Sequence, residues 1–382
     1  MEILVTNPAI RIRPPSKITN QKWLIEDFDS HKSFTMPEIA ISILIYCLNP
    51  QNKGEVIDEA SKFQGLSIQK ISALISSLLE RKFIINQSNK LSASHTKPLN
   101  SEYFYEQYQK WDEYKWGDSA EYHFFTYDYP FLDYTRGGSG WSIANQRMND
   151  YSVNTPDTNR TKIYSENHVR INFPLPFNNT LTELRDSVSA KQDTTLNIDD
   201  LALISAFGFA KTTEAPIPWN GVPLMRRTSP SGGSRHPTEG YLIACNIKGL
   251  ENGIYHIQSS PFCFVALETK CSINPSKLFP EFYHNNSLPE PAAIIILTSI
   301  FERNMFRYRE PRTFRTIHMD AGHIIGTIEL ITGHLNINTC TSHLFDEKGI
   351  EELIGIDGLS EGAITTIGVF NSSCEKNNVD KY

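Results

Sequence analysis

The sequence of 382 residues is 40% apolar and 21% charged, which is enough for two or three domains that each bury a core. A formal net charge of −7 argues against a protein whose main task is to coat nucleic acid, because such binding depends on neutralising phosphates. The sequence lacks an apolar run of the roughly 18 to 20 residues that a membrane span needs, and its start lacks the apolar stretch of a signal peptide. We therefore expect a cytoplasmic protein without a membrane partner.

Residues 1–30 are rich in Pro, Asn and charged side chains, and we expect them to form an extension with little structure of its own. Residues 31–98 are predicted to form a winged-helix-like domain, because three helical patterns precede a short apolar strand and a polar turn. Thr35 stands three residues before Glu38, which has the form of a capping box at the first helix. The helices are predicted over 36–48, 54–63 and 67–82, and the strand over 83–86.

The N-terminal part also differs from the rest of the chain in charge. Residues 1–98 carry 12 Lys and Arg against 9 Asp and Glu, a net charge of +3, which leaves −10 for the remaining residues. Beside so acidic a remainder, we expect this domain to recognise a peptide rather than DNA. Residues 99–180 form an aromatic-rich connecting segment, whose Trp and Tyr side chains predict a helix that packs on a neighbouring domain. A substrate-facing role for these side chains is the alternative.

From residue 181 to residue 382 helical and strand patterns alternate, which predicts a further domain of the α+β class. Asn197 and the acidic residues that follow it mark the start of a helix over 201–209. The segment 292–300 is apolar on both faces, as is typical of a strand in the middle of a sheet. Further elements are predicted as strands over 241–247, 253–257, 262–267 and 363–370, and as a helix over 320–335.

Common signatures of metal and nucleotide sites are absent from the sequence, which has no G-x-G-x-x-G opening a helix, no G-K-[ST] and no H-E-x-x-H. His318 and His323 are five residues apart, which is off one helical face. Cys340 is too loosely spaced from His334 and His343 to predict a metal site. The six cysteines include no C-x-x-C pair, so we expect reduced thiols and no bound metal.

The segment 226–241, RRTSPSGGSRHPTEGY, is the densest feature of the sequence. Pro230 restricts the backbone, and Gly232 and Gly233 remove side chains where a flat or large group approaches. The arginine pair at its start, 226–227, indicates an anionic ligand because guanidinium groups pair bidentately with phosphate. Further hydrogen-bond donors come from Ser231, Ser234 and Arg235. From composition alone, a plain connection between two elements is an equal alternative.

A second cluster of cations occupies residues 303–315, RNMFRYREPRTFR. It contains five arginines around Tyr308 in an otherwise acidic protein. A solvated basic loop is the alternative to a binding site here. The cluster stands between the most apolar strand and a predicted helix start at Asp320–His323, and helix starts and arginines both attract phosphate. The arginines are Arg303, Arg307, Arg309, Arg312 and Arg315.

Taken in order, the segments PSGGSRHPTEGYLIA and RYREPRTFR-x4-DAGH resemble the signature of the flavin-dependent SagB-like (azoline) dehydrogenases, a branch of the nitroreductase fold. The resemblance covers about residues 181–370. It implies an α+β fold in which a central, mostly antiparallel sheet is flanked by helices, with FMN held at a homodimer interface. It also implies oxidation of thiazoline or oxazoline rings to azoles in ribosomally made peptides.

The resemblance places the cofactor contacts on the glycine-rich turn and on a phosphate-binding segment near residue 185. That segment departs from the family pattern, because Asp186 replaces an arginine and only Lys191 follows as a cation. Together with the arginine clusters and the helix start, the residues expected to bind the cofactor are Arg185, Ser187, Arg227, Pro230, Ser231, Gly232, Gly233, Arg235, Arg312, Arg315, Gly322 and His323.

A second departure concerns catalysis. Where azoline oxidases carry a Lys-Tyr pair, this chain has Arg307 and Tyr308. Arginine stays charged in any ordinary site and is a poor base, so we expect Tyr308 to handle the proton and Arg307 to bind a carboxylate or stabilise an anionic intermediate.

The sequence therefore predicts an FMN-dependent oxidoreductase that oxidises a peptide or peptide-derived natural-product intermediate. One alternative is a reductase of an activated alkene or dehydroamino acid that uses NAD(P)H. A second is a non-catalytic scaffold in a peptide-modification complex, and a third is a transcription regulator. Besides a peptide substrate, the expected partners are a second copy of the chain and proteins of such a complex.

Overall fold

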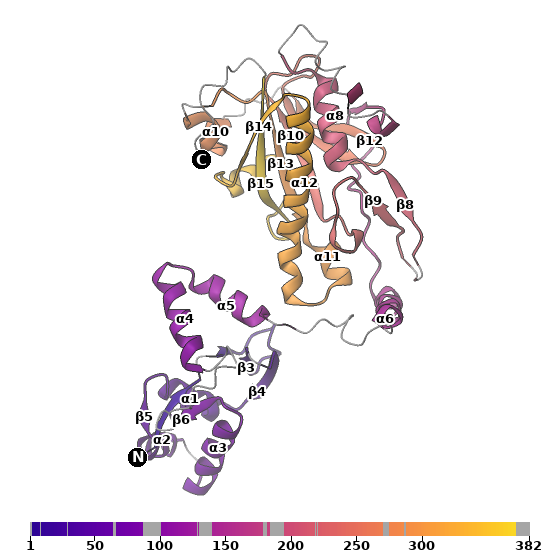
Figure 1. Cartoon of the computed structure of the whole chain (residues 1–382). Helices are drawn as coiled ribbons and strands as arrows, with labels where there is room; N and C mark the ends of the chain where they lie inside the picture. Colours follow the sequence, from indigo (N-terminus) through magenta and orange to yellow (C-terminus); the bar gives the residue numbers. More distant parts are fainter. Residues whose placement is uncertain are drawn as a thin grey trace. The chain divides into compact units, whose positions relative to one another are not determined.

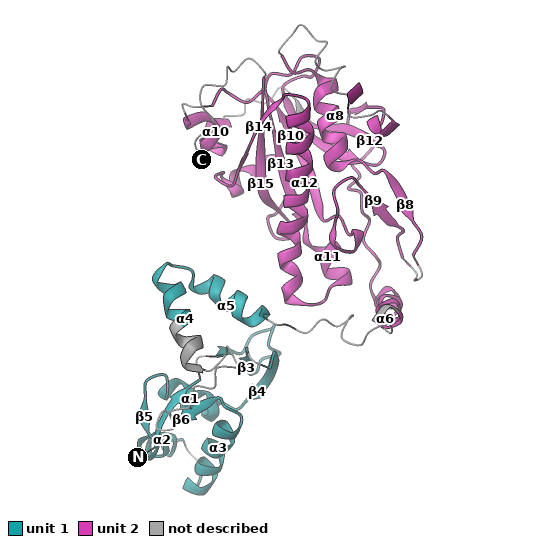
Figure 2. Ribbon diagram, in the orientation of Figure 1, with its two compact units in different colours: residues 1–131 teal, residues 132–382 magenta. Residues whose placement is uncertain are grey.

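The structure is a computed structural model that divides the chain into two compact units, Met1–Phe131 and Leu132–Tyr382 (Figure 2). The residues that the structure describes are 2–7, 9–28, 30–63, 66–86, 101–127, 129, 140–178, 182–183, 195–217, 219, 221–269, 275–285 and 288–371.

The N-terminal unit contains two small antiparallel sheets, in the orders β5-β1-β6 and β2-β3-β4. The expectation that residues 1–30 lack structure is wrong, because they supply three of these strands and place Leu4 and Ile25 fully inside the core. The reason is long-range pairing, since β1 pairs with segments about 50 and 80 residues away. The strands are β1 (Ile3–Thr6), β2 (Ile10–Arg13), β3 (Trp23–Asp27), β4 (Lys32–Met36), β5 (Gln51–Asn52) and β6 (Ile84–Asn86).

Three helices pack around these strands at the predicted places: α1 (Glu38–Tyr46), α2 (Lys53–Ala60) and α3 (Ile68–Glu80). The capping box at Thr35 is wrong, because Thr35 lies in β4 and pairs with Leu24, and Pro37 occupies the N-cap without a side-chain hydrogen bond. A capping box occurs instead at Asn52 before α2. The winged helix stays a prediction, and the polar turn expected after β6 lies outside the described residues.

The aromatic-rich segment 99–180 is divided between the two units. Helices α4 (Ser101–Glu113) and α5 (Gly117–Thr126) belong to the N-terminal unit, and α6 (Gly140–Asn154) belongs to the second. The ring of Trp111 in α4 stacks on that of His123 in α5, with centroids 5.3 Å apart. Aromatic side chains in this region therefore pack between helices of the same unit.

The second unit is built on a seven-stranded antiparallel sheet in the order β14-β15-β13-β10-β11-β12-β7. Its strands are β7 (Arg170–Asn172), β10 (Thr238–Ala244), β11 (Gly253–Ser259), β12 (Phe262–Thr269), β13 (Ala293–Ile300), β14 (Asn338–Ser342) and β15 (Glu361–Phe370). Helices α8 (Ile198–Phe209) and α12 (Phe314–His334) cover one face (Figure 1). Helices α9 (Pro275–Leu278), α10 (Pro280–His284) and α13 (Glu347–Ile354) lie against the other, where α10 and α13 bury Phe282, Ile350 and Ile354. The α+β class and the mostly antiparallel sheet are confirmed.

Local signals located several of these elements correctly. Asn197 caps α8 by accepting hydrogen bonds from the backbone of Asp199 and Asp200. β13 is buried along both faces, as its apolar run predicts, and pairs with β10 and β15. Among the described helices of the chain, none combines the length and the apolar character that crossing a membrane requires.

The region 301–334 differs from the prediction. Residues expected as a basic loop form α11 (Phe301–Arg307) and a short 3-10 turn, η4 (Pro311–Thr313), that runs into α12. Because α12 begins at Phe314, the segment 320–323 lies in its second and third turns and not at a helix start. Elements of this unit that sequence patterns did not indicate also include η2 (Pro176–Asn178), β8 (Thr213–Ala215), β9 (Leu224–Arg226) and η3 (Gly232–Ser234).

Candidate functional site

The glycine-rich turn connects β9 to β10 and meets the end of α11. Gly233, in η3, has φ +59°, a left-handed conformation that favours glycine. A Cβ atom there would lie 2.5 Å from the hydroxyl of Tyr308 and 3.0 Å from Cδ of Arg307. The missing side chain thus admits these two residues, and the structure brings together the turn and the Arg-Tyr pair that lie more than 70 positions apart.

Asp320 fixes the shape of the turn from α12. Its carboxylate accepts a hydrogen bond from Ser231 Oγ at 2.6 Å and one from the backbone N–H of Gly232 at 3.1 Å. Ser231 Oγ also accepts from the backbone N–H of His236 at 2.9 Å. Burial raises the pKa of Asp320, and the two hydrogen bonds oppose that shift. The sequence predicted Asp320 at a helix start and within the family signature, but it did not predict this anchoring role.

The two arginines before the turn point to different environments, because neighbouring side chains of an extended segment point in opposite directions. Arg226 is exposed and donates to Ser234 Oγ at 2.9 Å. Arg227 is buried and donates to the backbone oxygen of Thr238 at 3.1 Å. Burial lowers the pKa of Arg227 to about 10. The two guanidinium groups therefore do not form one anion-binding pair.

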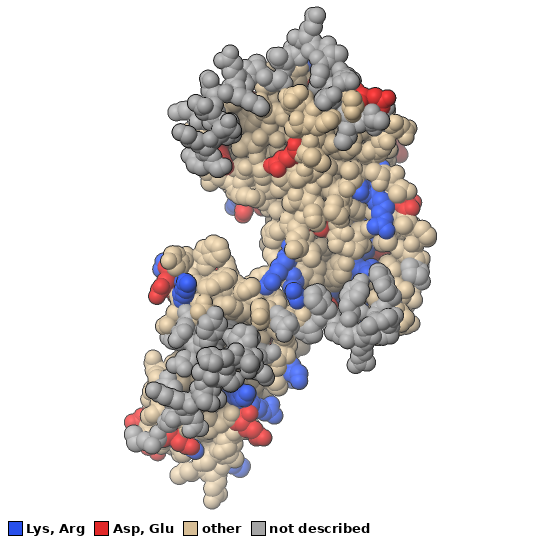
Figure 3. Space-filling view, in the orientation of Figure 1, with Lys and Arg blue, Asp and Glu red and all other residues tan. Residues whose placement is uncertain are grey.

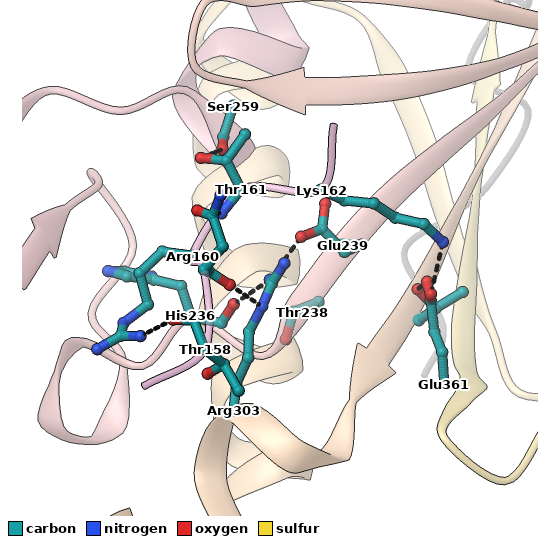
Figure 4. Close-up of polar contacts among 12 residues, drawn as sticks. Thr158, Arg160, Thr161, Lys162, His236, Thr238, Glu239, Ser259, Arg303 and Glu361 are labelled. Atoms are coloured by element: carbon teal, nitrogen blue, oxygen red, sulfur yellow. Dashed lines mark hydrogen bonds and ion pairs between the residues drawn. The ribbon is translucent and has the colours of Figure 1, made fainter. Parts of the chain in front are cut away.

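Behind the turn lies a buried network of charges. Arg235 is 1% exposed and contacts Asp157 at 2.9 Å, and Asp157 also pairs with Arg160 at 3.0 Å. Arg303 pairs with Glu239 at 2.5 Å, and its side chain is only 3% exposed, so the solvated-loop alternative is wrong for this arginine (Figure 4). These contacts tie segment 157–160, the turn and α11 together.

Burial and charge shape the ionisation of this network. Burial lowers the pKa of Arg235 to about 10 and that of His236 to about 3, so His236 is neutral at ordinary pH. Burial alone would raise the pKa of Glu239, but Arg303 and a 2.8 Å hydrogen bond with His256 hold it well below its usual range. Arg235, predicted as a cofactor ligand, is held here by Asp157 and by the backbone oxygen of Arg303.

The remaining cations of the 303–315 cluster follow α11 and the start of α12. The guanidinium of Arg307 lies 5.4 Å from the ring centroid of Trp219 and 5.4 Å from that of Tyr308. The guanidinium of Arg309 lies 3.8 Å over the ring of Tyr151. Among the other predicted cofactor residues, Pro230 is exposed beside the turn, Arg312 and Arg315 are half-buried, Gly322 and His323 are exposed on α12, and Arg185 and Ser187 lie outside the described residues.

A polar cluster that sequence reasoning missed lies where β10 and β15 approach the segment after α6. Lys162 Nζ contacts Glu361 at 2.6 Å (Figure 4). Lys162 Nζ also lies 2.5 Å from the hydroxyl of Tyr241, which donates to Glu361 at 2.9 Å. Glu361 also accepts from Thr298 Oγ1 at 2.7 Å. These residues are 63 to 199 positions away from Glu361 in sequence, so no local pattern pointed to the cluster.

The described core of this unit coincides with a recognisable sequence family. Residues 198–369 match the sequence profile of the nitroreductase family. The chain carries a nitroreductase-family domain. The family expected from the turn and the Arg-Tyr segment is thereby confirmed at this level.

Individual relatives of the nitroreductase domain include the trifolitoxin-processing protein TfxB of Rhizobium leguminosarum bv. trifolii, which is 31% identical over 199 residues, 50% of this chain and 52% of TfxB. A putative nitroreductase from Anabaena variabilis is similar with a TM-score of 0.45 and 20% identity over 60% of this chain and 46% of that chain. The chain thus spans about half the length of each. A microcin synthetase McbBCD complex from E. coli contains a chain that is 16% identical, with a TM-score of 0.36, over 75% of this chain and 99% of that one.

The turn of the nitroreductase domain has features that suit a flat ring system. A Cβ atom on Gly232 would approach nothing nearer than the Thr316 side chain at 3.8 Å, which leaves space on that side of the turn. The charge of Asp320 is already engaged by two donors, so it adds little repulsion to a bound anion. The exposed guanidinium of Arg226 is a cation available near the turn for a phosphate. These residues fit FMN, which would supply two-electron redox chemistry when bound.

Proposed function

We propose that this protein is an FMN-dependent oxidoreductase that oxidises a peptide or peptide-derived natural-product intermediate, such as an azoline to an azole. The observation that carries the proposal is the approach of Tyr308 and Arg307 to the glycine turn, where Gly233 leaves no room for any side chain but theirs. The nitroreductase domain and the similarity to a trifolitoxin-processing protein support the choice of flavin and of a peptide substrate.

The chemistry of the two side chains differs. The Tyr308 hydroxyl is a group that gains or loses a proton, and it lies next to the turn. Arg307 keeps its positive charge, so we assign it the stabilisation of negative charge on the phenol or on the substrate. In the oxidative direction bound FMN would take the hydride equivalent, and Tyr308, as a tyrosinate stabilised by the neighbouring Arg307 guanidinium, would take the proton.

The test is the Tyr308→Phe variant. Purified protein should show flavin absorbance or take up added FMN, and the variant should retain that FMN while turnover of an azoline peptide falls by about 10²-fold or more. Arg307→Lys is the matched comparison, because it restores the Lys-Tyr pair of azoline oxidases. A colourless protein that takes up no FMN would refute the proposal, and unchanged turnover in Tyr308→Phe would remove Tyr308 from the reaction.

Reduction of an activated alkene is a second candidate that Arg307 specifically favours. Addition of hydride to such an alkene creates negative charge on the substrate, which a permanently charged guanidinium beside Tyr308 stabilises. Anaerobic mixing of the FMN-loaded protein with NADPH separates the two directions. Rapid bleaching of the flavin supports the reductase, and a flavin that stays oxidised supports the oxidase.

We also propose a homodimer formed through α12. Its solvent-facing side exposes Met319 and Leu330 by 61% and 71%, and added Cβ atoms at Gly322 and Gly326 would meet no neighbour. Such an apolar face with small residues allows a second helix to approach closely. Sedimentation should give the mass of a dimer, and Gly326→Arg should yield a monomer.

A further inference from the structure

A cleft between α6 and α11 is lined by an excess of positive charge. Its wall contains Arg147 and Tyr151 from α6 together with Arg307, Arg309 and Glu310. Three arginines and one glutamate thus line the cleft in a chain whose net charge is −7. Figure 3 shows Lys and Arg side chains on the surface near the end of α12 that adjoins α11. The charge balance of the cleft favours an anionic ligand.

Aromatic rings hold two of these guanidinium groups in place. Arg309 stacks on Tyr151 at 3.8 Å, and Arg307 lies 5.4 Å from the ring centroids of both Trp219 and Tyr308. A guanidinium group that stacks on a ring uses its flat face for that contact, so its N–H groups can still donate hydrogen bonds in the plane of the group.

One donor of an arginine that lines this cleft is unsatisfied. Among the described residues, the buried Nε of Arg307 has no hydrogen-bond partner. A buried donor without an acceptor is unfavourable, and an acceptor supplied by a ligand would relieve that penalty. Because Arg307 also borders Tyr308, the acceptor would lie beside the group to which we assign proton transfer.

We propose that this cleft binds a carboxylate of the substrate, so that the protein acts on peptides or peptide fragments carrying a carboxylate close to the reacting group. The link between this site and the reaction rests on the proposed function, whereas binding of a carboxylate in the cleft does not. Arg307 and Arg309 bind the carboxylate oxygens through their planar N–H edges, and Arg147 adds positive charge from α6. A phosphate shares this chemistry, and the experiment separates the two sources.

The first arm of the test uses two small probes and the full-length protein. N-acetylglycylglycine and its C-terminal amide differ only in the carboxylate, and both are titrated into protein labelled with ¹⁵N-arginine. The carboxylate should shift the Nε–H signal that disappears in Arg307→Lys, and the amide should leave it in place. Equal shifts of the Arg307 Nε–H signal by the two probes, or no shift by the carboxylate, would overturn the proposal on the wild-type protein alone.

The second arm uses variants of the cleft. Arg147→Gln combined with Arg309→Gln should weaken binding of the carboxylate probe by about tenfold or more, since charge-assisted hydrogen bonds are lost. Lys348→Gln, on a side chain that is 86% exposed, is the control and should bind as the wild type does. Binding equal to wild type in the double variant would refute the assignment.

The phosphate source is tested on the same proteins with FMN and inorganic phosphate. The double variant should bind FMN with unchanged affinity, as followed by flavin fluorescence. A matching loss of FMN affinity, with phosphate competing against the carboxylate probe, would assign the cleft to the cofactor phosphate and overturn the proposal. If neither the wild type nor any variant binds FMN, the proposed reaction is refuted. The result with the carboxylate probe would still decide whether the cleft binds a carboxylate.

Discussion

Gly233→Ala tests whether the turn is built around the Tyr308 hydroxyl. Gly233 has φ +59°, and alanine in the left-handed region costs about 1 to 2 kcal/mol. The new Cβ would lie 2.5 Å from that hydroxyl and 3.0 Å from Cδ of Arg307, whereas ordinary contacts begin near 3.5 Å. Tyr308 must therefore move by roughly 1 Å, and overpacking of this kind adds about 1 to 3 kcal/mol.

The expected loss in the free energy of unfolding is thus about 2 to 5 kcal/mol, measured by urea denaturation. A displacement of about 1 Å at a reacting group lowers turnover by about 10²-fold, and FMN binding should also weaken. Gly232→Ala is the matched control for stability one residue away, where the new Cβ would meet only Thr316 at 3.8 Å. Equal unfolding free energies in the two alanine variants would refute the role given to Gly233.

Two buried carboxylates give further predictions. Burial raises the pKa of Asp320 in the folded protein above its unfolded-state pKa of about 3.9, so the folded protein binds a proton at Asp320 more tightly than the unfolded chain does. The stability gained from this difference is complete below about pH 3.9 and is lost as pH rises through the folded-state pKa. Relative to Asp320→Asn, the wild type should gain unfolding free energy as pH falls from about 7 to about 4; a constant difference contradicts this. Burial disfavours ionised Glu239, yet Arg303 and His256 lower its pKa, so this contribution exists above the unfolded value and is lost as pH falls. Glu239→Gln leaves Arg303 uncompensated and should destabilise the protein by about 3 to 5 kcal/mol at neutral pH in urea denaturation, whereas Glu352→Gln, at a side chain 70% exposed, should change little. A Glu239→Gln variant as stable as that control would show that the pair does not hold the turn in place.

Sequence patterns correctly predicted the helices and strands that are determined by residues close together in the sequence. The cap at Asn197 and the doubly apolar run of β13 each depend on neighbouring residues, and both were predicted. The N-terminal strands were missed because their hydrogen-bond partners lie far along the chain. Residues 301–307 were read as part of a charged loop because their arginines obscured the buried side of α11, where Arg303 finds Glu239 as a partner.

The arginines of this acidic sequence show the same contrast between what local sequence patterns predict and what long-range contacts determine. The nitroreductase-family domain, the glycine turn and the Arg307–Tyr308 pair could be predicted without the fold, because each is a contiguous pattern with its own chemistry. The burial of Arg303 and Arg235 as ion-pair partners, and the position of Arg307 beside Tyr308 at the turn, became known from the folded structure. The reason is that a charge has no fixed role along a chain, since its role depends on the burial and the partners that folding brings to it.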